Sequence, residues 1–126
     1  MTRDQVLDLC ARLPGAAEDY PFGDDVAVFK VDGKMFALVA LAGDPGSVSL
    51  KCDPDWALEL RAVHEAVRPG YHLNKRHWNT VELDGTVEDD ELREMVDHSY
   101  ELVVSRLSRS QRARLLGRDG PLGGTA

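Results

Sequence analysis

The sequence is poor in several residue types, and each shortage narrows what the chain can be. Aromatic residues make up 6% of its 126 residues, and its only cysteines are Cys10 and Cys52. No apolar stretch is long enough to span a bilayer, and no apolar signal run follows the first residues. A chain of this length buries enough surface to fold without a disulfide or a metal. We therefore expect a monomeric cytoplasmic protein with two reduced thiols and no membrane contact.

Motifs that carry catalysis are also missing from the sequence. It contains no nucleophile elbow, no glycine-rich phosphate loop and no paired-carboxylate motif. These absences favour a binding module over an enzyme, and they predict no bound cofactor.

Charge is unevenly distributed along the chain. The net charge is −7, which argues against a domain that binds nucleic acid with its whole surface. Residues 66–81 nevertheless hold three cations, two histidines and no carboxylate, and residues 108–118 hold four arginines and no carboxylate. Any electrostatic attraction for phosphate is therefore expected at one of these two stretches.

The first half of the chain predicts one helix followed by an antiparallel meander. Thr2 and Gln5 form a capping box for a helix over residues 3–13. Asp32-Gly33 suits a tight type I′ hairpin turn between strands at 26–31 and 34–41. A third strand is expected at 47–52, with Val48, Leu50 and Cys52 on the buried side and Ser47, Ser49 and Lys51 opposite. Residues 16–25 contain Pro21 and Gly23 and predict a loop.

The second half predicts two helices around one further strand. Asp53-Pro54 begins a short helix with Trp56, Leu60 and Val63 on its apolar side, and Pro69-Gly70 is expected to form a turn. A strand follows at 79–83, and a long helix runs from Asp89 to about Leu107. Terminal helices that flank antiparallel strands are typical of an α+β two-layer sandwich. We assign residues 1–107 to a single domain and 108–126 to a basic, partly flexible tail, which could extend the last helix.

The segment 69–80 is the most informative stretch of the sequence. It concentrates amide, cationic and aromatic side chains at Tyr71, Asn74, Lys75, Arg76, His77 and Trp78. Lysine and arginine neutralise phosphates, and aromatic rings stack on bases. A basic, aromatic loop that leads into a strand suits a winged nucleic-acid contact. The alternative is that the aromatic residues pack against the core while the cations form a solvated tip.

Other patterns in the sequence have weaker support. His64, His72 and His77 match no common metal-ligand spacing, so we expect no metal site. Tyr71 and Lys75 are spaced for proton transfer only on a helix, which Gly70 disfavours. The acidic residues near the N-terminus are typical of a solvated surface, and the C-terminal arginines could bind phosphate or cap a helix.

Five segments of the sequence together resemble the MmcQ/YjbR family. They are Pro21-Phe22-Gly23, residues 29–37, residues 48–54, residues 69–78 and Ser99-Tyr100, and they occur in the family's order within residues 3–107. The resemblance implies a fold similar to frataxin and CyaY, with a curved antiparallel sheet covered on one side by helices. It also implies DNA binding through a double-wing arrangement, and it supplies no catalytic residues.

These observations lead to one main functional hypothesis and three rivals. We expect a DNA-binding protein with weak, salt-dependent affinity, whose candidate surface is Lys51, Tyr71, Asn74, Lys75, Arg76, His77 and Trp78. An exposed cluster of Lys51, Lys75 and Arg76 beside Trp78 would favour it. The alternative is a protein- or small-molecule-binding domain, in which the same loop lines an apolar groove and the cations turn away. A frataxin-like metal handler and an enzyme rank third and fourth.

Overall fold

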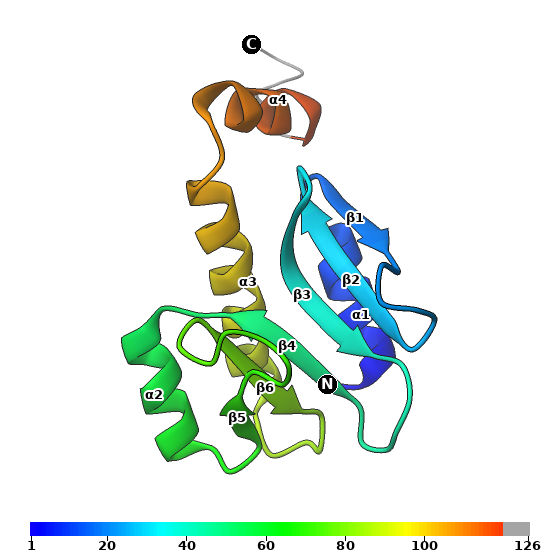
Figure 1. The fold of residues 1–126 in the computed structure, drawn as a ribbon, viewed down its shortest axis with the longest axis vertical. Helices are drawn as coiled ribbons and strands as arrows, with labels where there is room; N and C mark the ends of the chain where they lie inside the picture. The colour runs from blue at the N-terminus through cyan, green and yellow to red at the C-terminus, as the bar shows by residue number, and fades with distance from the viewer. Residues whose placement is uncertain (120–126) are drawn as a thin grey trace.

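The computed structural model describes residues 1–119, and the side chains of residues 1–115. Figure 1 shows an α+β fold in which helices pack against one open antiparallel sheet, as expected. The elements, in chain order, are α1 (Arg3–Arg12), β1 (Ala16–Asp19), β2 (Val26–Val31), β3 (Lys34–Ala40), β4 (Ser47–Lys51), α2 (Pro54–Val63), β5 (Val67–Pro69), β6 (Trp78–Glu82), α3 (Asp89–Ser105) and α4 (Arg109–Asp119).

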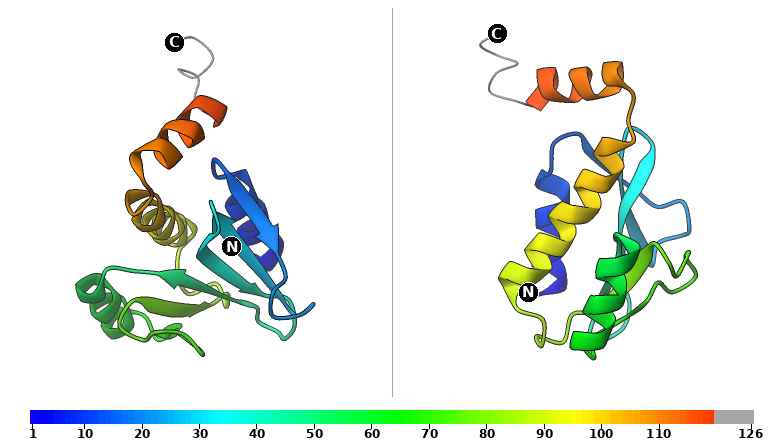
Figure 2. Two further views of the ribbon diagram at one scale, coloured as in Figure 1. Left: turned by 45° about the horizontal axis from the view of Figure 1, so that its top comes forward. Right: turned by 90° about the vertical axis from the view of Figure 1, so that its left-hand side faces the viewer.

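The sheet has six strands in the order β1-β2-β3-β4-β6-β5, and every neighbouring pair is antiparallel. Helices α1 and α3 lie on the same face of the sheet, as the right-hand view of Figure 2 shows. This face holds the core, which includes Phe29, Phe36 and Val39 from the strands and Val96 from α3. The opposite face carries no helix among the described residues.

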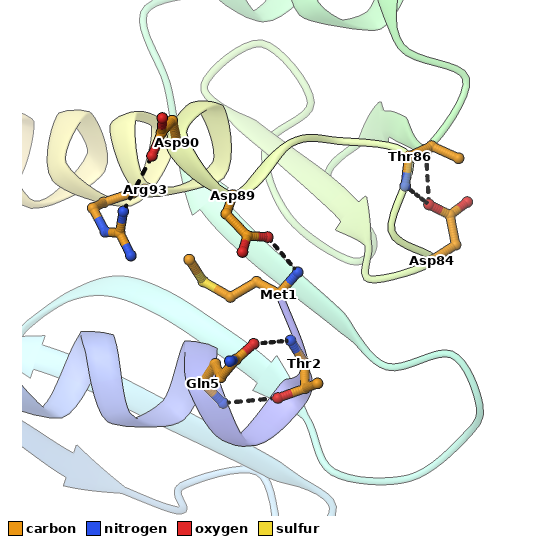
Figure 3. A network of polar contacts seen from close by, with 8 residues as sticks. All are labelled: Met1, Thr2, Gln5, Asp84, Thr86, Asp89, Asp90 and Arg93. Atoms are coloured by element: carbon orange, nitrogen blue, oxygen red, sulfur yellow. Dashed lines mark hydrogen bonds and ion pairs between the residues drawn. The ribbon is translucent and has the colours of Figure 1, made fainter.

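The capping box and the hairpin turn predicted for the first half of the sequence are both present in the structure. Gln5 N donates to Thr2 Oγ1 at 3.2 Å and Thr2 N donates to Gln5 Oε1 at 2.8 Å, which completes the capping box (Figure 3). The α-amino group of Met1 contacts Asp89 Oδ1 at 2.7 Å, so this end of α1 is tied to the start of α3. At the hairpin, Asp32 and Gly33 both have positive φ angles, 50° and 82°, as a type I′ turn requires.

Strands β3 and β4 separate beyond Ala37 and Leu50, and α3 passes across the place where they diverge. Here the side chain of Ser99, which is fully buried, joins both strands. Its hydroxyl donates to the carbonyl oxygen of Phe36 at 2.5 Å and accepts from Lys51 N at 2.9 Å. One hydroxyl group therefore satisfies a backbone acceptor of β3 and a backbone donor of β4 that do not pair with each other.

Two short strands were absent from the sequence-based expectation. Residues 16–19, predicted as part of a loop, form β1, and Val67–Pro69, next to the expected turn, forms β5. Both lie at the edges of the sheet, where one side of a strand has no partner and proline is tolerated. Neither shows apolar alternation: β1 exposes its last three side chains, and β5 buries Val67 alone, so backbone pairing with a neighbour defines both strands.

Two predicted burial patterns also need correction. Val63 of α2 is exposed, and the helix instead buries Ala57 and Leu60, with Trp56 half-buried. Ser49 was assigned to an exposed side of its strand, yet it is buried, because its hydroxyl lies 2.8 Å from Thr80 Oγ1 on β6. Thr80 on the neighbouring strand thus lies beside Ser49 on the same face of the sheet.

Residues 109–119 form a separate helix, α4, after a break that follows α3. Leu115 of α4 is buried and lies directly over Gly15, leaving no room there for a side-chain carbon. The tail over residues 108–126 was expected to be partly flexible, and its residues 120–126 lie outside the described residues. No helix within residues 1–119 is long and apolar enough to cross a membrane.

We expect Ser99→Ala to lower the free energy of unfolding by about 2–4 kcal/mol, because it strands one buried donor and one buried acceptor. Urea denaturation followed by circular dichroism measures the change. Ser105→Ala is the matched control, since the Ser105 hydroxyl donates to Leu102 O at 2.7 Å on the exposed end of the same helix. Equal effects of the two substitutions would show that Ser99 does not hold the two strands together.

Candidate functional site

The face of the sheet opposite the helices carries a groove of about 550 Å³. It lies over β2, β3, β4, β6 and β5, between the segment that leads into β2 and the loop that joins β5 to β6. The residues that line it are mostly apolar, and they are Phe22, Val26, Leu38, Ala40, Ser47, Ser49, Arg68, Tyr71, His72, Leu73 and Thr80.

The floor of the groove changes in character from one side of the sheet to the other. The register pairs Leu38 with Ser49, Ser49 with Thr80, and Thr80 with Arg68 across four neighbouring strands. Since paired residues point to the same face of a sheet, these side chains form one row. The row begins with an aliphatic group, continues with two hydroxyl groups and ends with a guanidinium group.

Aromatic rings form the walls of the groove. Tyr71 and Phe22 are 71% and 62% exposed, and they come from the two segments that flank the floor. His72 follows Tyr71 with its ring centroid 4.0 Å away, and its backbone has a φ of 57° in the left-handed region. A non-glycine residue rarely adopts this conformation, and such residues gather at binding and catalytic sites.

The loop over residues 70–77 is held from behind by Arg61 of α2. The Arg61 guanidinium donates to Asn79 Oδ1 at 2.7 Å, to Trp78 O at 3.3 Å and to Lys75 O. On the groove side, Tyr71 N donates to Thr80 Oγ1 at 3.0 Å. These bonds fix the loop at both its base and its far end, so that Tyr71 and His72 stand at the groove.

The structure does not gather the predicted cations around an exposed tryptophan. Trp78 is only 8% exposed, and its β-carbon lies close to Gly70, so its ring is a packing residue. Lys51 is half-buried beside it in the β4–β6 register. Burial, together with the charges of Arg106 and Lys34, lowers the pKa of the Lys51 ammonium group.

Most polar groups of the predicted surface are used within the loop itself. Lys75 Nζ donates to Gly70 O at 2.9 Å, and Asn74 Oδ1 accepts from Arg76 N at 2.9 Å. His77 is half-buried, and its carbonyl oxygen accepts from Cys52 N at 2.8 Å. Arg76 is exposed, and its guanidinium group forms no hydrogen bond or ion pair within the described residues. Of the seven predicted site residues, only Tyr71 lines the groove.

Sequence reasoning missed the rest of the groove. Its floor comes from alternate positions of β2, β3 and β4, where apolar and small polar residues look like ordinary strand positions. Phe22 was included in the family resemblance but was not assigned a role. Arg68 was counted as part of a basic stretch, although its position opposite Thr80 depends on the unpredicted strand β5.

A second hollow, of about 760 Å³, lies on the opposite side of the molecule between α2 and α3. Its lining is strongly acidic and consists of Asp53, Trp56, Asp90, Arg93, Glu94, Asp97, His98 and Glu101. Phosphate groups would be repelled from this helical side.

Neither the histidines nor the cysteines form a reactive cluster. His64 Nε2 contacts Glu91 Oε2 at 2.9 Å and links α2 to α3. No group of three or more His, Cys, Asp or Glu residues in the described part of the chain could hold a metal ion. Burial raises the pKa of the Cys10 thiol to about 12 and that of Cys52 to about 11, so both remain protonated at neutral pH.

Comparison with known proteins agrees with the fold and with the resemblance in the sequence. The model of the YjbR family matches residues 11–102, a range that contains every residue lining the groove. The chain belongs to the YjbR family. It is 38% identical to the uncharacterized protein YjbR of Escherichia coli K12. The alignment spans 116 residues, which are 92% of this chain and 98% of that protein.

Two further relatives extend the comparison. The uncharacterized protein YbdF of Escherichia coli O157:H7 is 35% identical over 108 residues, 85% of this chain and 88% of that protein. The crystal structure of Deinococcus radiodurans protein DR2400 matches with a TM-score of 0.85 and 42% identity, over 90% of this chain and 87% of that one. Family membership thus fixes the fold, while the names of these relatives carry no activity.

We expect Arg61→Ala to lower the free energy of unfolding by about 2 kcal/mol, because the base of the 70–77 loop loses its charged donor. Amide hydrogen exchange should quicken at His77, whose N–H donates to Asn74 O within the loop. Arg12→Ala is the control, because Arg12 pairs with Asp8 on the exposed side of α1, and its loss should lower the free energy of unfolding by no more than about 0.5 kcal/mol. Unchanged exchange in the loop of Arg61→Ala would contradict this role.

Proposed function

We propose that this YjbR-family domain is a binding module that takes a small molecule with an apolar body into the groove on its uncovered sheet face. The observation that carries the proposal is the groove itself, with aromatic walls, an aliphatic floor and a few polar groups at one side. Its volume of about 550 Å³ lies within the range that small-molecule sites occupy, roughly 300–1,000 Å³.

The exposure of the groove walls supports a role in binding. Phe22 and Tyr71 are among the most exposed large apolar side chains of the described residues, and both border the same hollow. Scattered apolar side chains on a surface are ordinary, but clustered ones usually mark a site of interaction. A bound ligand would remove both rings from water, and this burial would provide the favourable free energy of binding.

The proposal involves recognition and no chemical step. The hydroxyl groups of Ser49 and Thr80 contact each other, Thr80 also accepts from Tyr71 N, and neither hydroxyl is hydrogen-bonded to a histidine or carboxylate among the described residues. The groove lining contains no carboxylate, lysine or cysteine. Its polar groups are suited to orienting a ligand.

A fluorescence titration with 8-anilinonaphthalene-1-sulfonate tests the groove. We expect saturable binding that Tyr71→Ala and Phe22→Ala each weaken by about tenfold, because each removes one aromatic wall. Leu58→Ala is the matched control, since Leu58 is 61% exposed on α2, away from the groove. If Leu58→Ala weakens binding as much as the wall variants do, or if the probe does not bind, the groove is not the site.

DNA is the second candidate ligand, and the exposed Arg76 favours it. Arg76 stands in the same loop as the exposed ring of Tyr71, with its guanidinium group available for a phosphate. The acidic hollow between α2 and α3 would direct a duplex to the sheet side of the molecule. With a net charge of −7, such binding would be weak and salt-dependent.

Anisotropy of a labelled duplex, measured at about 20 mM and 150 mM salt, tests this second candidate. Binding at low salt should weaken severalfold in Arg76→Ala, and the dependence of the logarithm of affinity on the logarithm of salt should fall by about one. Arg93→Ala, on the acidic side of α3, should have no effect. Absence of binding at low salt would eliminate DNA and leave the small-molecule proposal intact.

A further inference from the structure

We propose that the ligand of the groove is an aromatic carboxylic acid, whose ring system lies between Phe22 and Tyr71 and whose carboxylate pairs with Arg68. This inference rests on the proposed function and adds the chemical class of the ligand. It follows from the order of chemical groups along the groove floor, from the single charge in its lining and from the flat rings in its walls.

The floor predicts a ligand with one apolar end and one polar end. Leu38, Ala40 and Val26 form the aliphatic end over β2 and β3. Arg68 stands at the other end on β5, three strands away from Leu38 in the order of the sheet. Since neighbouring strands lie about 4.8 Å apart, a ligand that touches both ends must be elongated.

Charge determines which polar group the ligand carries. Arg68 is the one lysine or arginine among the described residues that line the groove, and no carboxylate is among them. The chain as a whole has a net charge of −7, so this end of the groove has the opposite sign of charge from the protein overall. An anionic group on the ligand is the complementary partner.

The surroundings of Arg68 are suited to a carboxylate in particular. Its Nη2 contacts Glu82 Oε1 at 2.8 Å, and it forms no other hydrogen bond or ion pair within the described side chains. The remaining N–H groups of the guanidinium fork can therefore receive a second planar acid. Because Glu82 already neutralises part of the charge, the site suits a singly charged carboxylate better than a doubly charged phosphate.

The aromatic walls determine the shape of the apolar part of the ligand. The rings of Tyr71 and His72 contact each other on one side of the floor. Phe22 comes from the segment that borders the other side. Aromatic rings pack well against other rings in offset or edge-to-face arrangements. A flat, rigid ring system can pack against these walls with little loss of conformational entropy on binding.

Calorimetric titration with biphenyl-4-carboxylate and with its neutral analogue, biphenyl-4-carboxamide, tests the carboxylate inference separately from the proposed apolar-ligand groove. We expect the carboxylate to bind at least tenfold more tightly, because only the acid forms a charge-assisted pair with Arg68. Equal affinities would overturn the carboxylate inference while leaving an apolar-ligand groove in place. If neither compound binds, and the anilinonaphthalene probe also fails, the proposed function itself is wrong.

Two substitutions at the polar end sharpen the test. Arg68→Gln should reduce the affinity for the carboxylate by about tenfold and leave the carboxamide unchanged. Glu82→Gln should act in the opposite direction and strengthen carboxylate binding severalfold, because it removes the competing anion. Arg93→Gln is the control, since Arg93 pairs with Asp90 on α3. Loss of affinity for both compounds in Arg68→Gln, or weaker carboxylate binding in Glu82→Gln, would contradict the proposed pairing.

Discussion

The architecture depends on how α3 is fixed to a sheet that divides between β3 and β4. A buried serine hydroxyl at the point of division satisfies one strand's carbonyl group and the other strand's amide group, which would otherwise lack partners. Unmet backbone groups in a dry core cost far more than an ordinary hydrogen bond contributes. Ser99 therefore lets the two halves of the sheet separate without leaving these two backbone groups unpaired, and α3 packs across both halves.

This arrangement also fixes the proposed site, although Ser99 lies on the other face. The aliphatic end of the groove belongs to β2 and β3, whereas its hydroxyl groups and guanidinium group belong to β4, β6 and β5. The two ends are joined only through the β3–β4 register, in which Leu38 faces Ser49. The angle at which the halves meet thus sets the distance between the apolar and the charged parts of the groove.

Local chemistry made much of the fold predictable from the sequence. The capping box at Thr2, the Asp32-Gly33 turn and the Asp53-Pro54 helix start each depend on neighbouring residues, and each forms as expected. Strands β1 and β5 depend instead on backbone pairing with other strands, and their own side chains show no apolar alternation. The groove was unpredictable for the same reason, because its lining is assembled from residues 22–80 by the register of five strands.

The loop over residues 70–77 shows that composition alone does not reveal which side chains a loop exposes. Its lysine, asparagine and tryptophan suggested a nucleic-acid surface, yet they bond within the loop or pack beneath it. Composition cannot distinguish a side chain that shapes a loop from one that the loop presents. The loop places the Tyr71–His72 pair at the groove. The left-handed backbone conformation of His72 could not be predicted from any residue pattern.

The most direct test of the account is a map of amide chemical shifts in the ¹⁵N-labelled protein during titration with biphenyl-4-carboxylate. We expect the shifts to concentrate on the groove, at Leu38, Ala40, Ser49, Arg68, Tyr71, His72 and Thr80, while the outer faces of α2 and α3 stay unchanged. Shifts centred on α2 and α3, or spread evenly over the surface, would show that the uncovered sheet face is not where this domain binds its ligand.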